Sequence, residues 1–464
     1  MFRALRPVFT RPSGTVRTCA LLVLLAATGI AILELVREQT GTPGFFVGLG
    51  LALLPVAPLM AAFRWLGRAA PAPWSQLLFC FGWGACTAAL IAILANNFAT
   101  EWIAAATADP SGADRLGSVA IAPVVEESAK AAALLLVFAF RRRHLTGPAD
   151  GFVVAGFTAT GFAFTENILY LGNAFVQDLA DGTTGVLNSV TAATFFVRVV
   201  LSPFAHPLFT VLTGLGVGAA AARARRSHRI CLPLLGLAAA MGMHALWNGS
   251  SQFGDHGFHI VYACVMVPAF GLLVWLAVRI RHRRLRAVAD ELALYAAAGW
   301  LAPAEVPALA SMPARSLARA LARRSGGRAA GRAVARYEAD AAALALLRNR
   351  ARRGRPSPEA DFARRERELL HRLWQRRATA APALARAAVL EELLPPWSHA
   401  AQPTDGVTVA GPAAVPGPRR EEARREEVRR EEPFLRRSGP WTPATPAGPS
   451  SIRPCVLPGG DGVR

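Results

Sequence analysis

Long apolar segments are the feature of this sequence that most constrains its fold. A helix needs about 20 mostly apolar residues to cross a bilayer, and blocks of this kind fill the chain up to about residue 280. The whole chain of 464 residues is 53% hydrophobic and only 18% charged, which is not the composition of a soluble domain. We therefore expect an all-α, polytopic transmembrane helix bundle. About eight spans are predicted, near residues 19–36, 44–63, 76–95, 118–140, 151–173, 193–222, 230–247 and 259–280.

The loops between these blocks carry charges of alternating sign. One set is basic and includes Arg64, Arg141 and Arg223, whereas the alternate set is acidic and includes Glu101 and Asp178. Because basic loops remain on the cytoplasmic side of a membrane, this alternation predicts an even number of spans with both termini in the cytoplasm. The strong preference for Arg over Lys is typical of a GC-rich bacterium, so we expect a multi-pass protein of its cytoplasmic membrane.

Outside the expected spans the chain is polar and basic. We expect a basic cytoplasmic N-terminus over residues 1–18, a transmembrane domain over 19–280, a basic helical cytoplasmic segment over 281–394 and a disordered Pro/Arg/Glu-rich tail over 395–464. The net charge is +20, and the sequence contains no nucleic-acid-binding motif. The basic segments are therefore expected to face the anionic inner leaflet of the bilayer and not a nucleic acid.

Three ionisable side chains lie within about one helical turn of the fourth expected span. Lys130 follows Glu126 by four residues and Glu127 by three, so both carboxylates lie close to the ammonium group on a helix. Placing each such group in the hydrocarbon of a bilayer costs about 3 kcal/mol or more, so we expect each to have a structural or functional role. Lys130 is also the only lysine of the chain. A lysine can keep one carboxylate ionised and leave the other for chemistry; the alternative is a structural ion pair between helices.

Two further segments place polar groups among apolar residues. Glu166 and Asn167 in the fifth expected span either enter a polar cavity shared with the two glutamates of the fourth, or form an interhelical hydrogen bond. Arg198 either pairs with a glutamate inside the membrane or extends to the interface, and the sequence leaves this open. The block 193–222 contains two prolines, so it is either one kinked helix or a broken pair.

Only two histidines lie well inside expected spans. His206 stands between Pro203 and Pro207, where the helix is irregular, and His244 shares a helix face with Asn248 four residues later. A single buried histidine is more often a hydrogen-bonded core residue than a ligand. Two histidines together with three glutamates instead indicate metal-binding or acid–base chemistry.

Four motifs lie in order on successive spans. They are Glu126-Glu127-x-x-Lys130, Gly161-Phe-Ala-Phe-x-Glu166-Asn167, Ser202-Pro-Phe-x-His206-Pro-x-x-Thr210 and His244-x-x-Trp247-Asn248. Together they resemble the motifs of the PrsW family of intramembrane proteases, over about residues 115–250 and with no departure at a motif position. The resemblance implies a multi-span endopeptidase that cuts membrane-anchored proteins in regulated proteolysis, for example of anti-sigma factors. The CAAX prenyl endopeptidases, which also carry paired glutamates and two histidine motifs, are more distantly similar.

Peptide hydrolysis by this set of residues can proceed with or without a metal. With zinc, His206, His244 and Glu166 are the expected ligands, and Glu126 or Glu127 takes the proton from the bound water. No HExxH motif on one helix demands zinc. The sequence therefore keeps zinc open and slightly favours the scheme without it.

In the metal-free scheme, the glutamates and histidines themselves activate the water. Glu126 and His206 take its proton, while His244 and Asn248 donate hydrogen bonds to the oxyanion. The other two charged groups of the fourth span orient the site. The candidate catalytic residues are Glu126, Glu127, Lys130, Glu166, His206, His244 and Asn248.

Two other classes of function fit parts of the sequence. Buried carboxylates, lysine and histidine also occur in proton-coupled transporters, but the hydropathy shows no inverted repeat. A non-catalytic membrane scaffold would account for the basic tail and leave the charges inside the membrane unexplained. The sequence therefore favours a protease, and it does not identify the substrate or the cut site.

Overall fold

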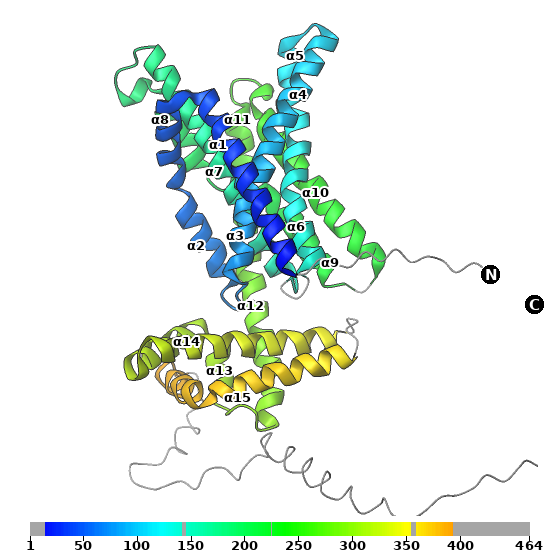
Figure 1. Cartoon of the computed structure of the whole chain (residues 1–464), viewed down its shortest axis with the longest axis vertical. Helices are drawn as coiled ribbons and strands as arrows, with labels where there is room; N and C mark the ends of the chain where they lie inside the picture. The colour runs from blue at the N-terminus through cyan, green and yellow to red at the C-terminus, as the bar shows by residue number, and fades with distance from the viewer. Residues whose placement is uncertain (1–13, 142–144, 224, 354–358, 393–464) are drawn as a thin grey trace, which may run out of the picture. The chain divides into compact units, whose positions relative to one another are not determined.

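The computed structural model describes residues 14–141, 145–223, 225–353 and 359–392, which are almost entirely helical and contain no strand. The expectation of an all-α membrane protein is confirmed, whereas the expected disordered tail lies outside the described residues. We call helices α1–α11, with the first part of α12, the membrane unit (Figure 1). Its helices are α1 (Gly14–Leu53), α2 (Val56–Gly67), α3 (Trp74–Gly82), α4 (Ala89–Thr107), α5 (Pro110–Leu116), α6 (Ala122–Phe140), α7 (Pro148–Ala180), α8 (Val190–Phe195), α9 (Ala205–Ala221), α10 (Arg226–Asn248), α11 (Gly257–Val261) and α12 (Val267–Ala297).

Short π-helical and 3-10 segments join several of these helices. The π-helical segments η1, η2, η5 and η7 each continue directly into or out of an α-helix, so they lengthen the spans without ending them. Two 3-10 segments, η4 and η6, lie in the connections after α7 and α10. Their bounds are η1 (Trp83–Ala88), η2 (Gly117–Ile121), η4 (Val186–Asn188), η5 (Phe196–Leu201), η6 (Gly249–Phe253) and η7 (Tyr262–Met266).

Six helical stretches in the described residues are long and apolar enough to cross a membrane, so the chain is a multi-pass membrane protein. The expected count of eight is not confirmed. Two expected spans, 19–36 and 44–63, fall within the single stretch Thr18–Gly67, which is interrupted at Gly41 by a positive φ of 66°. The fourth expected span is α6, which holds three charged side chains and is not among the six. The six stretches are Thr18–Gly67, Trp74–Thr107, Pro148–Ala180, Val190–Ala221, Arg226–Phe253 and Gly257–Ala297.

The stretch 193–222 is a broken pair of helices. The π-helical segment η5 ends at Leu201, and α9 begins at Ala205. Pro203 has no N–H to continue a helix, and the Ser202 hydroxyl donates to the carbonyl of Val197 at 2.6 Å, which satisfies one backbone group at the break. His206 therefore lies in the first turn of α9.

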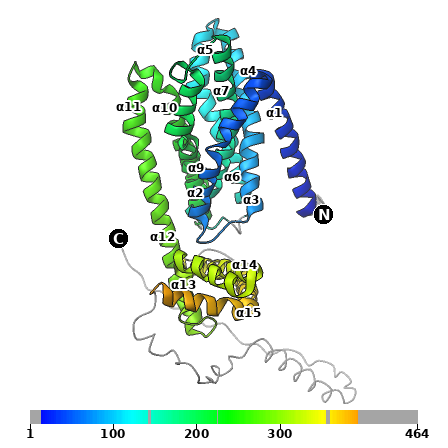
Figure 2. The same cartoon turned by 90° about the vertical axis from the view of Figure 1, so that its left-hand side faces the viewer.

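Helix α7 is the central helix of the membrane unit and packs against α1, α2, α3 and α9 (Figures 1 and 2). Most of its side chains from Ala149 to Ala163 are buried. Small residues allow this packing because they let helix backbones approach closely. A Cβ atom at Gly161 would meet the Phe81 carbonyl on α3, and one at Gly151 would meet the Gly214 carbonyl on α9.

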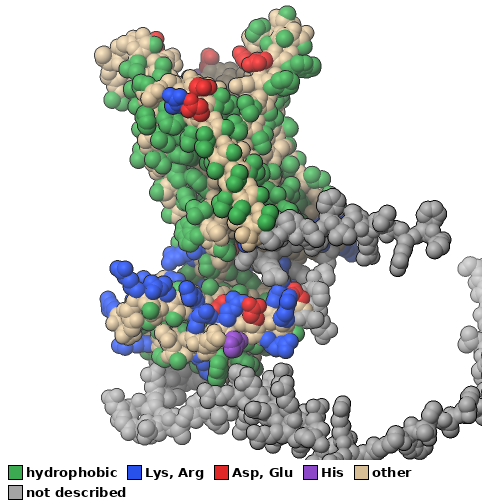
Figure 3. Space-filling model, in the orientation of Figure 1, with side chains coloured by type: hydrophobic (Ala, Val, Ile, Leu, Met, Phe, Trp, Pro, Cys, Tyr) green, Lys and Arg blue, Asp and Glu red, His purple; other side chains and the backbone are tan. Residues whose placement is uncertain are grey.

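A second group of helices follows the membrane unit in the chain. It consists of the end of α12 with α13 (Glu305–Ala310), α14 (Met312–Arg352) and α15 (Glu359–Leu390), and it has its own buried core. Helix α14 is kinked at Gly327, which has a φ of 69°. Arginines cover the visible surface of α14 and α15, whereas apolar side chains cover the visible face of the membrane unit (Figure 3).

Replacing Gly161 by alanine should destabilise the membrane unit, because the added methyl group meets the backbone of α3. Such overpacking costs about 1–3 kcal/mol, so we expect a lower Tm for thermal unfolding in detergent. Gly242→Ala is the matched control, since a Cβ atom at this exposed glycine of α10 has no neighbour within 4 Å. An equal Tm for both variants would contradict the close approach of α3 and α7.

The helices after the membrane unit should lose stability as the pH rises. Burial raises the pKa of Glu338 from its ordinary 4.5 to about 7, against the attraction of Arg319 and Arg315. The folded state therefore holds this proton more tightly, so the stabilisation is complete below about pH 4.5 and is lost as the pH rises through 7. Glu338→Gln should raise the Tm at pH 8.5 and much less at pH 5. The exposed Asp290→Asn is the control, and a pH-independent effect of Glu338→Gln would contradict the expectation.

Candidate functional site

Helix α6 carries the charged group predicted for the fourth span, and all three side chains are buried. Lys130 and Glu127 are 0% exposed, and Glu126 is 6% exposed. The Lys130 ammonium donates to Oε1 of Glu127 at 2.8 Å and to Oε2 of Glu126 at 3.3 Å. It also lies 3.7 Å from the centre of the Phe162 ring on α7. The spacing of three and four residues thus brings the ammonium group to both carboxylates.

His206 of α9 connects this group to α7. Its Nε2 lies 2.5 Å from Oε2 of Glu166, and its Nδ1 lies 3.2 Å from Nζ of Lys130. A carboxylate accepts and an ammonium donates, so these partners assign the proton of a neutral ring to Nε2. The lone pair of Nδ1 then points towards Lys130. The structure thus brings Glu166 into contact with His206, whereas the sequence left open whether Glu166 enters a polar cavity with Glu126 and Glu127 or forms an interhelical hydrogen bond.

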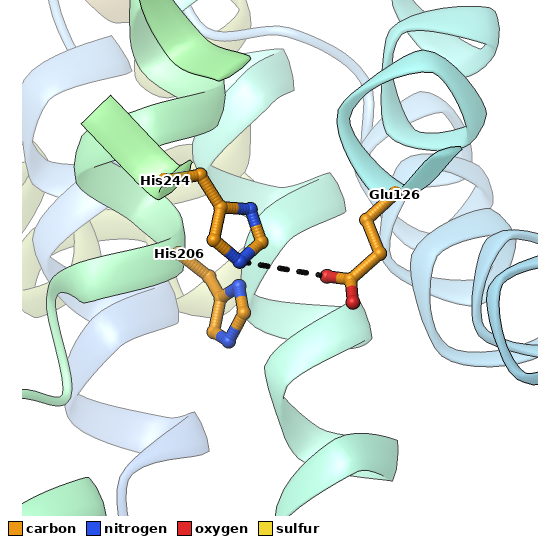
Figure 4. Close-up of side chains that lie close together, drawn as sticks. All are labelled: Glu126, His206 and His244. Atoms are coloured by element: carbon orange, nitrogen blue, oxygen red, sulfur yellow. Dashed lines mark ion pairs between the residues drawn. The ribbon is translucent and has the colours of Figure 1, made fainter. Parts of the chain in front are cut away.

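The ring of His244 on α10 lies beside that of His206, at 5.4 Å between centres, and both rings are on the same side of Glu126 (Figure 4). Its Nδ1 lies 3.3 Å from Oε1 of Glu127, and its Nε2 lies 3.9 Å from Oε2 of Glu126. The ring stacks on Phe209 at 4.8 Å between centres. The second oxygen of Glu127 accepts a hydrogen bond from the Thr210 hydroxyl at 2.9 Å. Both carboxylate oxygens of Glu127 therefore contact neighbouring side chains.

A cavity of about 600 Å³ opens onto these groups. Five of the seven predicted residues line it: Glu126, Glu166, His206, His244 and Asn248. The other two, both on α6, lie behind this wall. The Nδ2 of Asn248 donates to the carbonyl of Ser118 at 2.9 Å, which places this amide at the exposed rim. The remaining lining is mostly polar, so water can reach the buried glutamate and histidines. Its polar residues include Asn96, Asn97, Thr100, Glu101 and Asp114.

Arg198, which the sequence left undecided, pairs with Glu166 inside the membrane unit. Its Nε donates to Oδ1 of Asn167 at 2.9 Å, and its guanidinium lies 3.9 Å from the centre of the Tyr170 ring. The sequence feature that indicated an intramembrane role for Arg198 is its position within an apolar run. The sequence analysis did not predict the contact between Thr210 and Glu127, although Thr210 follows His206 by four residues on the same helix face.

The donor set suits zinc, although it differs from the expected one. The ligand atoms of Glu126, His206 and His244 all lie within 4.8 Å of one another, whereas Glu166 faces the opposite nitrogen of His206. Two histidines and one carboxylate, with room for water, form a known catalytic zinc set. The outer nitrogen of each histidine contacts a carboxylate, as is usual for zinc-bound histidines.

A positive charge already lies among these donors. The Lys130 ammonium is 3.2 Å from Nδ1 of His206 and 3.3 Å from Oε2 of Glu126. Zinc bonds are about 2.0–2.2 Å long, so the three donor atoms would have to draw together around a metal ion. The residues present therefore fit zinc by the chemistry of their donor atoms, and not by the present spacing of those atoms around the Lys130 ammonium.

Comparison with known proteins assigns the membrane unit to a family. The family model described as PrsW family intramembrane metalloprotease matches residues 72–274. Comparisons with curated proteins and with solved structures gave no match. The matched region contains all seven predicted site residues and ends before α13–α15. The match covers 203 of the 464 residues, and it supports an intramembrane metalloprotease of the PrsW family and therefore a peptidase.

Proposed function

We propose that this protease hydrolyses peptide bonds of membrane-anchored proteins at the cavity between α6, α7, α9 and α10. The observation that carries the proposal is the convergence of Glu126, His206 and His244 on a water-accessible cavity among apolar helices. We place the enzyme in the cytoplasmic membrane of a GC-rich bacterium, with both termini in the cytoplasm and the arginine-rich helices at the anionic inner leaflet. Regulated proteolysis, for example of anti-sigma factors, is the role we propose from the family resemblance.

Glu126 is the residue on which both catalytic schemes depend. Without a metal, its carboxylate takes a proton from a water in the cavity as the water attacks the peptide carbonyl carbon. The same proton then passes to the leaving amine. With zinc, Glu126 becomes the third ligand beside His206 and His244 and replaces Glu166 of our sequence-based prediction. A bound zinc ion supplies a Lewis acid that polarises the carbonyl group and lowers the pKa of water.

The other predicted residues support these steps. An amide NH2 group has two donor hydrogens, and Asn248 uses one of them on the Ser118 carbonyl. The other is free to stabilise the oxyanion. A neutral His244 donates its single proton from Nδ1 to Glu127, so Nε2 adds a second donor only in the imidazolium form. Lys130 and Glu127 are fully buried, so we assign them to holding the two histidines and Glu126 in place. Neither a transporter nor a scaffold gains support from the family assignment.

Glu126→Gln should lower the rate of cleavage by roughly 10²–10⁴, the usual contribution of a general base. The rate is measured with the full chain in proteoliposomes and a panel of single-span membrane proteins. Glu38→Gln is the control, because Glu38 is an exposed carboxylate of α1 far along the chain from the site. Full activity of Glu126→Gln would contradict the role of this residue in either scheme.

Elemental analysis of protein purified without chelator separates the two schemes. If zinc is the cofactor, wild type should hold about one zinc per chain, His206→Ala and His244→Ala should lose it, and 1,10-phenanthroline should stop cleavage reversibly. Cleavage by metal-free protein that still requires Glu126 and His206 would assign the water activation to these two side chains. Zinc retained by both histidine variants would refute the proposed ligand set.

Glu166→Gln and Arg198→Gln should each reduce cleavage, and their effects should not add. Arg198 forms an ion pair with Glu166, and Glu166 contacts Nε2 of His206. Both substitutions therefore act through the same imidazole. Loss of such an outer partner costs roughly 10- to 100-fold in activity or metal affinity. A double-mutant cycle measures the coupling. Strictly multiplicative effects would show that Arg198 acts elsewhere, and Arg198→Lys should recover part of the activity if charge alone holds Glu166.

A further inference from the structure

A second cavity, of about 290 Å³, is also lined by His206. It shares four lining residues with the larger cavity: Arg198, His206, Trp247 and Asn248. The two cavities therefore meet at the imidazole that the proposed chemistry uses. A substrate bound at His206 has access to both.

The smaller cavity differs from the larger one in its lining. Val56 and Leu59 of α2, Ala163 and Phe164 of α7, and Phe258 of α11 give it a largely apolar wall. The larger cavity is instead lined by amides, hydroxyls and carboxylates. His206 thus lines both a cavity that suits water and one that suits a hydrocarbon side chain.

We propose that the smaller cavity binds the side chain of the substrate residue next to the cleaved bond and selects a large apolar residue such as Leu or Phe. This inference rests on the proposed function, because it assumes a peptide at His206. An extended peptide points successive side chains to opposite sides. A carbonyl group presented to Glu126 in the polar cavity therefore leaves a neighbouring side chain directed to the apolar one.

The size of the cavity supports a single side chain as its occupant. Pockets for small molecules are usually about 300–1,000 Å³, so 290 Å³ lies just below that range. A whole transmembrane helix is about 10–12 Å wide with its side chains and does not fit. The substrate therefore has to be unwound at this point, which also frees its backbone groups for hydrogen bonds.

Polar groups at the edge of this cavity favour a peptide over a lipid chain. Asn167, Asn248, Ser250 and Ser251 line it beside the apolar residues. An unwound peptide in a membrane needs hydrogen-bond partners for its N–H and C=O groups, whereas an acyl chain has none to satisfy. The combination of apolar wall and polar edge matches a peptide segment with one apolar side chain.

Substitution of Leu59 can change the size of the smaller cavity, and its helix α2 carries no predicted catalytic residue. It is half-buried on α2 and lines the cavity. Leu59→Trp should fill the space and Leu59→Ala should enlarge it. Leu54 provides the matched control, because it is 57% exposed and does not line the cavity.

The first test is cleavage of single-span peptides that carry Ala, Leu, Phe or Trp at the mapped cut site. Wild type should prefer Leu and Phe over Ala by at least about 10-fold, as expected when a pocket loses methylene contacts. Leu59→Trp should shift the preference towards Ala, and Leu59→Ala should shift it towards Trp. Leu54→Ala and Leu54→Trp should keep the wild-type order. An unchanged order in both Leu59 variants would overturn the proposal.

The second test does not depend on catalysis and uses the full chain with Glu126→Gln in lipid nanodiscs. A photo-crosslinking residue at position 59 should capture a single-span peptide, whereas the same residue at position 54 should not. Capture of lipid alone at position 59, or equal capture of peptide at both positions, would overturn the proposal. Capture at position 59 by a protein whose wild type cleaves no peptide would instead support the binding site and refute the proposed function.

Discussion

The buried ammonium group of Lys130 determines how four helices of the membrane unit must pack. A charge removed from water without partners is strongly unfavourable, and removal of one partner from a buried pair is costly. Lys130 is therefore tied to two carboxylates of α6 and to Nδ1 of His206 on α9. Each of these partners needs partners of its own. Glu127 engages Thr210 and His244, while His206 engages Glu166 of α7.

The irregular backbone of the membrane unit serves this network. The break at Ser202 brings His206 into the first turn of α9, and such a break is tolerated at membrane depth because it lines a cavity. Glycines of α7 let that helix approach α3 and α9 closely, which brings Glu166 within reach of His206 and Arg198. Local departures from ideal helices therefore set the distances in the site.

Much of the candidate site could be predicted from the sequence, because ionisable residues in apolar segments are rare and costly. Glu126, Glu127, Lys130, Glu166, His206, His244 and Asn248 all meet around one cavity or directly behind its wall. Their pairing could not be predicted, since it depends on which face of each helix turns inwards. For this reason Glu126 lies with the two histidines where Glu166 was expected.

The architecture was harder to predict than the site. The number of spans stayed uncertain because hydropathy does not separate a kinked helix from two helices, as α1 shows at Gly41. Alanines make up 10 of the 21 buried residues in the core of α12–α15, and their pattern gives little contrast against the surrounding arginines.

The position of the only lysine gives the protein a built-in reporter. Lys130 is 0% exposed and touches Glu126, Glu127 and His206, the groups on which the proposed chemistry turns. Isotope labelling of lysine in the unmodified sequence would therefore yield one side-chain resonance, and that resonance would come from the centre of the site. Binding of a metal ion or of a substrate could be followed there by spectroscopy without any substitution in the membrane helices.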